Sequence, residues 1–155
     1  MKYIKINENG IHIVFGITDR NQIKLLHFSK ADFCEEDICK FGPECKAEDL
    51  ARRDQLIDEA FQLVQVNLAG YDRPYEKHGN KHICTVPGYL LTYAGMDDCV
   101  NEIGRKITVY QEDRTVTHVR LETEMQFYKG TSVVRMKNRI INEGEDTQCL
   151  EYLSS

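Results

Sequence analysis

The chain has 155 residues, of which 41% are hydrophobic and 29% are charged, and its formal net charge is −5. This length fits one domain, and the acidic balance argues against a partner with a phosphate backbone, so no nucleic-acid role is expected. Six cysteines in 155 residues are about 4% of the chain, well short of the roughly 8–10% that is typical of a disulfide scaffold, so free thiols are expected.

Neither a membrane span nor an export signal is visible in the sequence. No apolar run approaches the roughly 18 residues that a membrane-spanning helix needs, so we expect no membrane partner. The amino terminus, Met1–Glu8, has no apolar segment followed by a small-residue cleavage site. These features predict a soluble, cytoplasmic protein.

The amino-terminal part of the chain predicts an antiparallel meander. Short apolar segments alternate with turn-forming residues at Asn9-Gly10 and Asp19–Asn21. The expected strands are Lys2–Ile6, Ile11–Thr18 and Gln22–Phe28.

Helical periodicity is confined to the stretch Ala31–Glu59. Residues from Leu50 to Ile57 recur at helical spacing, and Gly42-Pro43 would end an earlier turn. We expect one or two short helices in this stretch.

A long loop is predicted at Gly70–Gly88, because this segment has no periodicity and many turn-forming residues. Long loops in compact domains often carry function. Strands are expected on either side of it, at Phe61–Leu68 and Tyr89–Tyr93, and again at Lys106–Tyr110.

The last third of the chain has the clearest strand pattern. From Thr117 to Tyr128 apolar and polar residues alternate, which predicts one buried face and one solvated face. A turn at Lys129–Thr131 then leads into a returning strand, Ser132–Ile141, so a long hairpin is expected. A final strand is predicted at Cys149–Leu153.

The elements together predict a mainly β protein. About eight or nine short strands with turn signals between them are typical of an antiparallel β-sandwich, here with one or two short helices between Ala31 and Glu59. We expect a single β-sandwich domain spanning residues 1–155.

Three cysteines, Cys34, Cys39 and Cys45, lie close together downstream of His27. Structural zinc sites usually take pairs of ligands about two to four residues apart, and these cysteines are more widely spaced with no second pair in register. We therefore expect thiols here, no metal site and no cofactor.

Two histidines, His78 and His82, lie in the predicted loop. They could act as an acid–base or metal-binding pair, they could hold the loop's shape through hydrogen bonds, or they could contact a ligand or a neighbouring subunit. Gly79 and Asn80 argue against a helix that would bring the two imidazoles together.

Aromatic and acidic residues leave further alternatives open. Tyrosines near the loop could stack on sugar rings or simply pack: Tyr71, Tyr75, Tyr89 and Tyr93. Acidic residues such as Glu122 and Glu124 fall on the face predicted to be solvated. The sequence motifs of nucleotide binding, zinc proteases and nucleophile elbows do not occur.

A series of segments in chain order matches a known pattern. They are Ile11–Phe15, Leu25–Phe28, Phe61–Gly70, His78–His82, Val86–Tyr93, Asn101–Lys106, Phe127–Gly130, Val133–Arg135 and Ile141–Gly144. This series resembles the amino-terminal domain of glycoside hydrolase family 36 α-galactosidases, which is a β-supersandwich of the galactose-mutarotase-like type. The stretch Ser29–Glu59 matches least.

The resemblance implies that the catalytic residues lie elsewhere. In that family a (β/α)₈ barrel follows the β-domain and carries the catalytic carboxylates, and such a barrel needs about 250 residues. The resemblance therefore implies a truncated amino-terminal domain of a longer enzyme, with no catalytic residue of its own. The implied partners are the downstream barrel domain of the same parent chain and further copies in a homo-oligomer.

A loop of this domain can reach a neighbour's active site in the family, and the matching loop here is Asp72–Gly88. The resemblance thus suggests a substrate-binding or subunit-contact loop that could touch a galactoside. Its candidate residues are Asp72, Arg73, Tyr75, His78, Asn80 and His82.

Three functions are open at this point. The first is a non-catalytic domain of an α-galactosidase-like hydrolase of carbohydrate metabolism, serving assembly and shaping the substrate pocket. The second is a stand-alone carbohydrate-binding module, and the third is a mutarotase-like enzyme with His78 or His82 as general acid. The first also predicts an unpaired sheet edge that would promote self-association.

Overall fold

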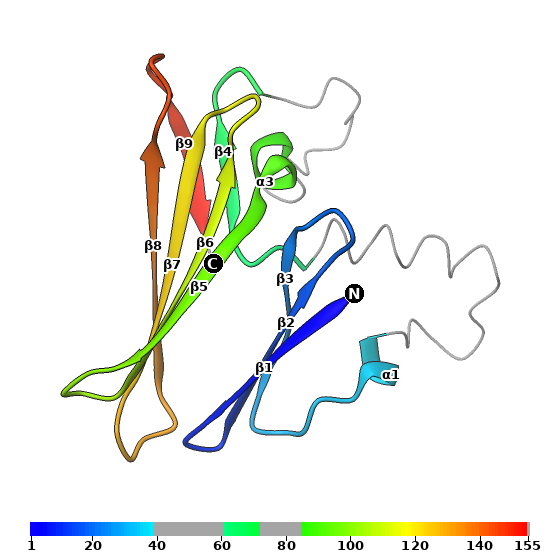
Figure 1. The fold of residues 1–155 in the computed structure, drawn as a ribbon, viewed down its shortest axis with the longest axis vertical. Helices are drawn as coiled ribbons and strands as arrows, with labels where there is room; N and C mark the ends of the chain where they lie inside the picture. The colour runs from blue at the N-terminus through cyan, green and yellow to red at the C-terminus, as the bar shows by residue number, and fades with distance from the viewer. Residues whose placement is uncertain (39–60, 72–84, 155) are drawn as a thin grey trace.

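The computed structural model describes residues 1–38, 61–71 and 85–154, and this part of the chain is mainly β (Figure 1). The strands are β1 Lys2–Glu8, β2 Ile11–Ile17, β3 Ile23–Ser29, β4 Gln65–Leu68, β5 Thr92–Val100, β6 Arg105–Asp113, β7 Val119–Phe127, β8 Val134–Asn142 and β9 Leu150–Ser154. The helices are α1 Glu35–Ile38 and α3 Val86–Leu90.

The strands form three antiparallel sheets. A four-stranded meander has the order β5-β6-β7-β8, a three-stranded sheet has the order β1-β2-β3, and β4 pairs with β9. A bridge between Lys24 and Gln62 connects β3 to the segment that leads into β4. Figure 1 shows the two larger sheets facing each other. The predicted antiparallel β-sandwich is confirmed.

One apolar core lies between the layers. Phe15 of β2 and Leu121 of β7 are completely buried in it, and burial of side chains of this size stabilises the fold by roughly 1.5–3 kcal/mol each. The buried members of the core come from all three sheets and from the segments that lead into β4 and β5: Ile6, Ile11, Ile13, Phe15, Ile23, Leu63, Val64, Val66, Leu68, Leu91, Ile107, Val109, Val119, Leu121, Met125 and Phe127.

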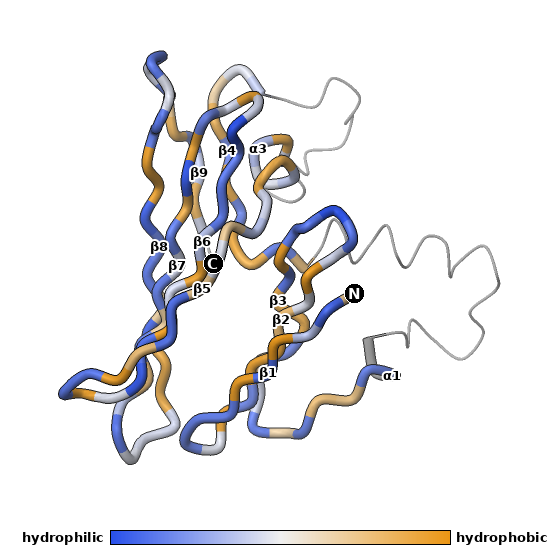
Figure 2. Tube along the Cα trace, in the orientation of Figure 1, coloured by the Kyte–Doolittle hydropathy of each residue, from blue (hydrophilic) through white to orange (hydrophobic). Residues whose placement is uncertain are grey.

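Strand β7 shows the alternation that the sequence predicts. Val119, Leu121 and Met125 are buried, whereas Arg120 and Glu122 on the opposite face are half-buried. The pleat of a strand directs successive side chains to opposite faces, so one face packs on the core and the other meets water. Hydrophilic and hydrophobic residues accordingly alternate along β7 (Figure 2).

The strand predicted at Tyr89–Tyr93 is confirmed only for its last two residues, Thr92 and Tyr93. This segment begins inside α3, and β5 starts only at Thr92. Thr85 caps the helix, because its hydroxyl accepts a hydrogen bond from the Gly88 N–H at 3.2 Å. Pro87 lies in the first turn, where a missing N–H has no helical partner to lose. The helix-start signals Thr85 and Pro87 therefore produce a helix here, although the apolar residues of the segment suggested a strand.

Two other expectations are met in part. Helix α1 falls inside Ala31–Glu59, but residues 39–60 lie outside the described part of the chain. Of the strand predicted at Phe61–Leu68, only Gln65–Leu68 is β4. The residues before it approach β3 instead, where the Leu25 N–H donates to the carbonyl of Phe61 at 2.9 Å.

Candidate functional site

The loop residues singled out by the family resemblance all fall within residues 72–84, outside the described part of the chain. They are Asp72, Arg73, Tyr75, His78, Asn80 and His82, and their roles stay predictions. Of the neighbouring tyrosines, Tyr71 and Tyr93 pack against the core. The side chain of Tyr89 lies beneath the Arg20 guanidinium, 5.6 Å from the ring centroid.

The buried carboxylate of Asp113 organises the connection between β6 and β7. Its Oδ1 accepts hydrogen bonds from the N–H and hydroxyl of Thr115 at 2.9 and 2.7 Å, and its Oδ2 accepts from the N–H and hydroxyl of Thr117, both at 2.8 Å. Burial raises the pKa of Asp113, but these hydrogen bonds favour the ionised form more strongly and lower the pKa to about 2. Both carboxylate oxygens accept hydrogen bonds from the turn, so Asp113 has a structural role there.

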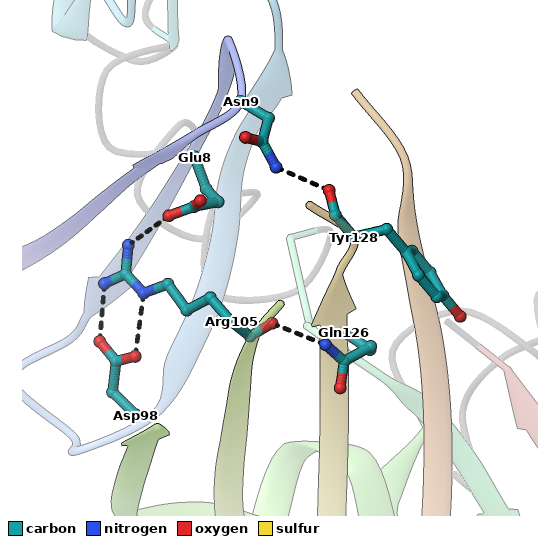
Figure 3. A network of polar contacts seen from close by, with 6 residues as sticks. All are labelled: Glu8, Asn9, Asp98, Arg105, Gln126 and Tyr128. Carbon is teal, nitrogen blue, oxygen red and sulfur yellow. Dashed lines mark hydrogen bonds and ion pairs between the residues drawn. The ribbon is translucent and has the colours of Figure 1, made fainter. Parts of the chain in front are cut away.

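A polar joint connects the two layers at one end of the sandwich (Figure 3). Arg105 of β6 donates from Nε and Nη2 to both carboxylate oxygens of Asp98, at 2.9 and 2.6 Å. Its Nη1 donates to Oε2 of Glu8 on the opposing sheet at 3.4 Å. The hydrogen bonds to Arg105 lower the pKa of Asp98, and the same bonds raise the pKa of Arg105. The geometry is that of a bidentate ion pair with a structural role.

The turn between β5 and β6 displays apolar side chains at the same end. Asn101 shapes it by accepting hydrogen bonds from the N–H groups of Ile103 and Gly104, at 3.1 and 2.9 Å. Val100 is 77% exposed and Ile103 is 52% exposed. Val133 in the β7–β8 turn is also exposed.

The outer face of the β5–β8 sheet carries most of the charge in this layer. One row of directly opposed residues crosses all four strands and reads Asp97, Thr108, Glu124, Lys137. Lys106 Nζ lies 3.8 Å from the Glu124 carboxylate. Opposite charges on adjacent strands contribute about 0.2–1 kcal/mol per pair, so this face is stabilised in water by its own side chains.

A second cluster on this face surrounds the Tyr110 ring. The Arg120 guanidinium lies 5.0 Å from the ring centroid and 3.2 Å from the Glu122 carboxylate. The Tyr110 hydroxyl donates to Asp97 at 2.7 Å, and this hydrogen bond raises the pKa of Tyr110. Glu122 also pairs with Arg139 at 3.5 Å. Glu122 therefore lies on the outer face, as the strand pattern predicts, but it is half-buried and paired with two arginines.

Strands β5 and β8 are the edges of this sheet. Within the described chain, β5 hydrogen-bonds along its length only to β6, and β8 only to β7. The start of β5 is anchored by Tyr93, whose N–H donates to the carbonyl of Asn21 at 2.6 Å. Strand β8 runs for nine residues against β7 without a bulge. It is a long, regular edge.

Possible metal ligands do not converge in the described residues, where no group of three or more His, Cys, Asp or Glu side chains comes together. His27 Nε2 hydrogen-bonds the carbonyl of Ala31 at 2.8 Å. Cys34 is an exposed free thiol, as are Cys99 and Cys149. Cys39 and Cys45 lie outside the described part of the chain.

A scan against models of known protein families and a search of curated proteins found no match to this chain. Among the helices that the structure describes, none is long and apolar enough to cross a membrane. The feature that the structure adds to the sequence is the pair of edge strands, β5 and β8, each with a strand partner on one side only among the described residues. An unpaired edge was expected from the family resemblance, but not which strands would form it, although Arg135, Lys137 and Arg139 at alternate positions indicated a basic strand face.

Proposed function

We propose that the chain is a non-catalytic domain that serves assembly, as the amino-terminal β-domain of an α-galactosidase-like glycoside hydrolase. The assembly role is supported by one observation above all, the four-stranded sheet whose two edge strands have no further strand partner among the described residues, with Asp97 on one edge and Lys137 on the other. The parent enzyme is supported by the sequence resemblance, which implies a β-sandwich for this domain.

The state of the buried and paired carboxylates supports a non-catalytic domain. Glycoside hydrolysis uses two carboxyl groups about 5–10 Å apart, one of which must exchange a proton with the substrate. In the described residues, Asp113 is engaged by its own turn and Asp98 by Arg105. Both are held in the ionised form, which is unsuited to a general acid at neutral pH.

The first experiment measures catalysis by the purified chain. We expect no hydrolysis of a chromogenic α-galactoside and no acceleration of galactose anomer interconversion above the buffer rate. Either activity, if it disappeared on replacing His78 and His82 by Ala, would overturn the non-catalytic role and favour the mutarotase-like or hydrolytic alternative.

The second experiment concerns the parent chain. Reading the source gene past the codon for Ser155 should reveal a continuing frame with alternating strand and helix patterns, and the encoded downstream segment should co-purify with this domain when the two are expressed as separate chains. A stop codon at that position would overturn the parent-enzyme part. Heat released on titration with galactose or raffinose would then favour a stand-alone carbohydrate-binding module.

A further inference from the structure

The geometry points to edge-to-edge assembly of this chain with itself: we propose that the β5 edge of one copy pairs antiparallel with the β8 edge of a second copy. This inference rests on the proposed assembly function and names its partner. It is carried by strand direction, by the charge on the two edges and by the incomplete cover of the core at β8.

Strand direction permits the pairing without any reorientation. Each neighbouring pair in β5-β6-β7-β8 is antiparallel, so the first and last strands of the sheet also run in opposite directions. A second copy placed beside the first in the same orientation therefore presents β5 antiparallel to β8. The two sheets would continue as one antiparallel sheet.

The charges on the two edges favour a junction without stagger, in which each cross-strand row of one copy continues into the same row of the next. Asp97 and Lys137 are the two ends of the same cross-strand row, so a second copy placed without stagger brings Asp97 directly opposite Lys137. Lys137 is exposed and makes no ion pair within the described chain. The new pair would extend the row of charges that the single sheet already has.

Like charges disfavour the two alternatives in which an edge pairs with the same edge of a second copy. If β8 paired with β8 of another copy about Asn138, Lys137 would lie opposite Arg139, and like charges directly opposite each other are destabilising. If β5 paired with β5, Asp97 and Asp98 of both copies would gather in one short strip. Basic residues on a sheet edge normally prevent such pairing, and here they repel an identical edge while attracting an acidic one.

The core is incompletely covered where β8 ends the sheet. Val134, Met136 and Ile140 point toward the core and are only partly buried. Met96, on the core-facing side of β5, is also only partly buried. An added strand would cover these side chains and satisfy the free backbone groups of the edge, which is how extended segments dock on sheets.

Two charge reversals test the proposal with full-length chain. In light scattering coupled to size-exclusion chromatography, the wild type should associate, and Lys137→Glu and Asp97→Lys should each raise the concentration for half-association by roughly five- to tenfold. An equimolar mixture of the two variants should regain wild-type association, because each restores the opposite charge for the other. Lys30→Glu is the matched control, since Lys30 is exposed and lies outside both edge strands.

A disulfide reports the register. The unstaggered junction places Cys99 of β5 opposite Arg135 of β8. Oxidation of Arg135→Cys should therefore give more covalently linked copies on a non-reducing gel than oxidation of the wild type, and adding Cys99→Ser should remove this increase. An increase that persists without Cys99 would contradict the register and overturn the proposed junction.

Three further results would also contradict the proposed pairing. A monomeric wild type, an Asp97→Lys variant that associates normally, or a mixture that fails to restore association would each overturn the pairing of β5 with β8. Circular dichroism of each variant verifies that it is folded. The proposed function fails on a different result, namely enzymatic activity of the chain or failure to co-purify with its downstream segment.

Discussion

Asp113 and Gly104 each determine the shape of one connection between strands. Asp113 does so through charge, because its carboxylate collects four hydrogen bonds from Thr115 and Thr117. Gly104 does so through space, because the carbonyl of Phe127 occupies the position that a Cβ would take. Each makes a prediction about stability that can be measured on the isolated chain.

The depressed pKa of Asp113 predicts a specific pH dependence. Its folded pKa of about 2 lies below the ordinary value of 3.8, so ionised Asp113 stabilises the fold fully above pH ~4, and this contribution is lost as the pH falls through about 2. Asp113→Asn should lower the free energy of unfolding by about 2 kcal/mol at neutral pH and progressively less toward pH ~2. Urea unfolding at a series of pH values measures both effects.

Asp146→Asn is the matched control for this series. Asp146 is exposed, and its only hydrogen bond in the described structure uses its backbone carbonyl. Its substitution should leave the pH profile of unfolding unchanged. Equal profiles for Asp113→Asn and the wild type would show that the hydrogen bonds of the turn do not hold the carboxylate in its ionised form.

Gly104→Ala should be among the most damaging single-methyl additions. A Cβ at this position would lie 2.0 Å from the carbonyl oxygen of Phe127, which belongs to the backbone and cannot rotate away. We expect a loss of about 3 kcal/mol in the free energy of unfolding. Gly130→Ala is the comparison, since Gly130 has a φ of 70° but open space around it, and should cost only about 1 kcal/mol. Equal losses in thermal or urea unfolding would argue against the steric explanation.

At the scale of elements, Arg105 ties the β5–β6 hairpin to the sheet on the other side of the core. It pairs with Asp98 of its own hairpin and with Glu8 at the end of β1. The three side chains are partly exposed, so solvent screening reduces the energy of the pairs. The main effect of these ion pairs is to orient the two layers relative to each other at this end of the sandwich.

Arg105→Gln should lower the free energy of unfolding by about 1 kcal/mol at low salt, and by less at high salt because the ion pairs are screened. Arg114→Gln is the control, because within the described residues the ion pair of Arg114 is with Glu112, two positions away, and Arg114 is 77% exposed. It should be close to neutral. An equal effect of the two substitutions in urea unfolding would contradict a special role for the polar joint.

Elements with a regular period were predictable, and elements decided by local caps or distant contacts were not. The alternation from Thr117 to Tyr128 located β7, because a period of two is a property of the strand itself. Helix α3 was missed because Thr85 and Pro87 start it inside a segment rich in apolar residues. Strand β4 is shorter than predicted because the residues before it turn toward β3.

At the scale of the whole molecule, the charged edges predict that self-association depends on ionic strength. The Debye length falls to about 3 Å at 1 M salt, so the attraction between Asp97 and Lys137 of neighbouring copies should be screened. We expect weaker association at high salt in sedimentation measurements on the wild type. Association that strengthens with salt would point to the apolar turn residues Val100 and Ile103 as the contact instead.

A junction between different edges also has consequences for growth. Pairing of β5 with β8 is heterologous, so each new copy exposes the same free edges and the assembly either closes into a ring or continues as a filament. Light scattering distinguishes a single defined mass from a distribution that broadens with concentration.

The sequence by itself determined the class of the fold and the identity of most strands, because strand alternation and turn chemistry are local properties. It also contained the Asp113 turn, whose partners lie within four residues. Only the tertiary structure decided that Asp97 and Lys137 end the same row. Three strand registers had to be known to align residues 40 positions apart, and those registers are set by packing on the core and by the geometry of each turn.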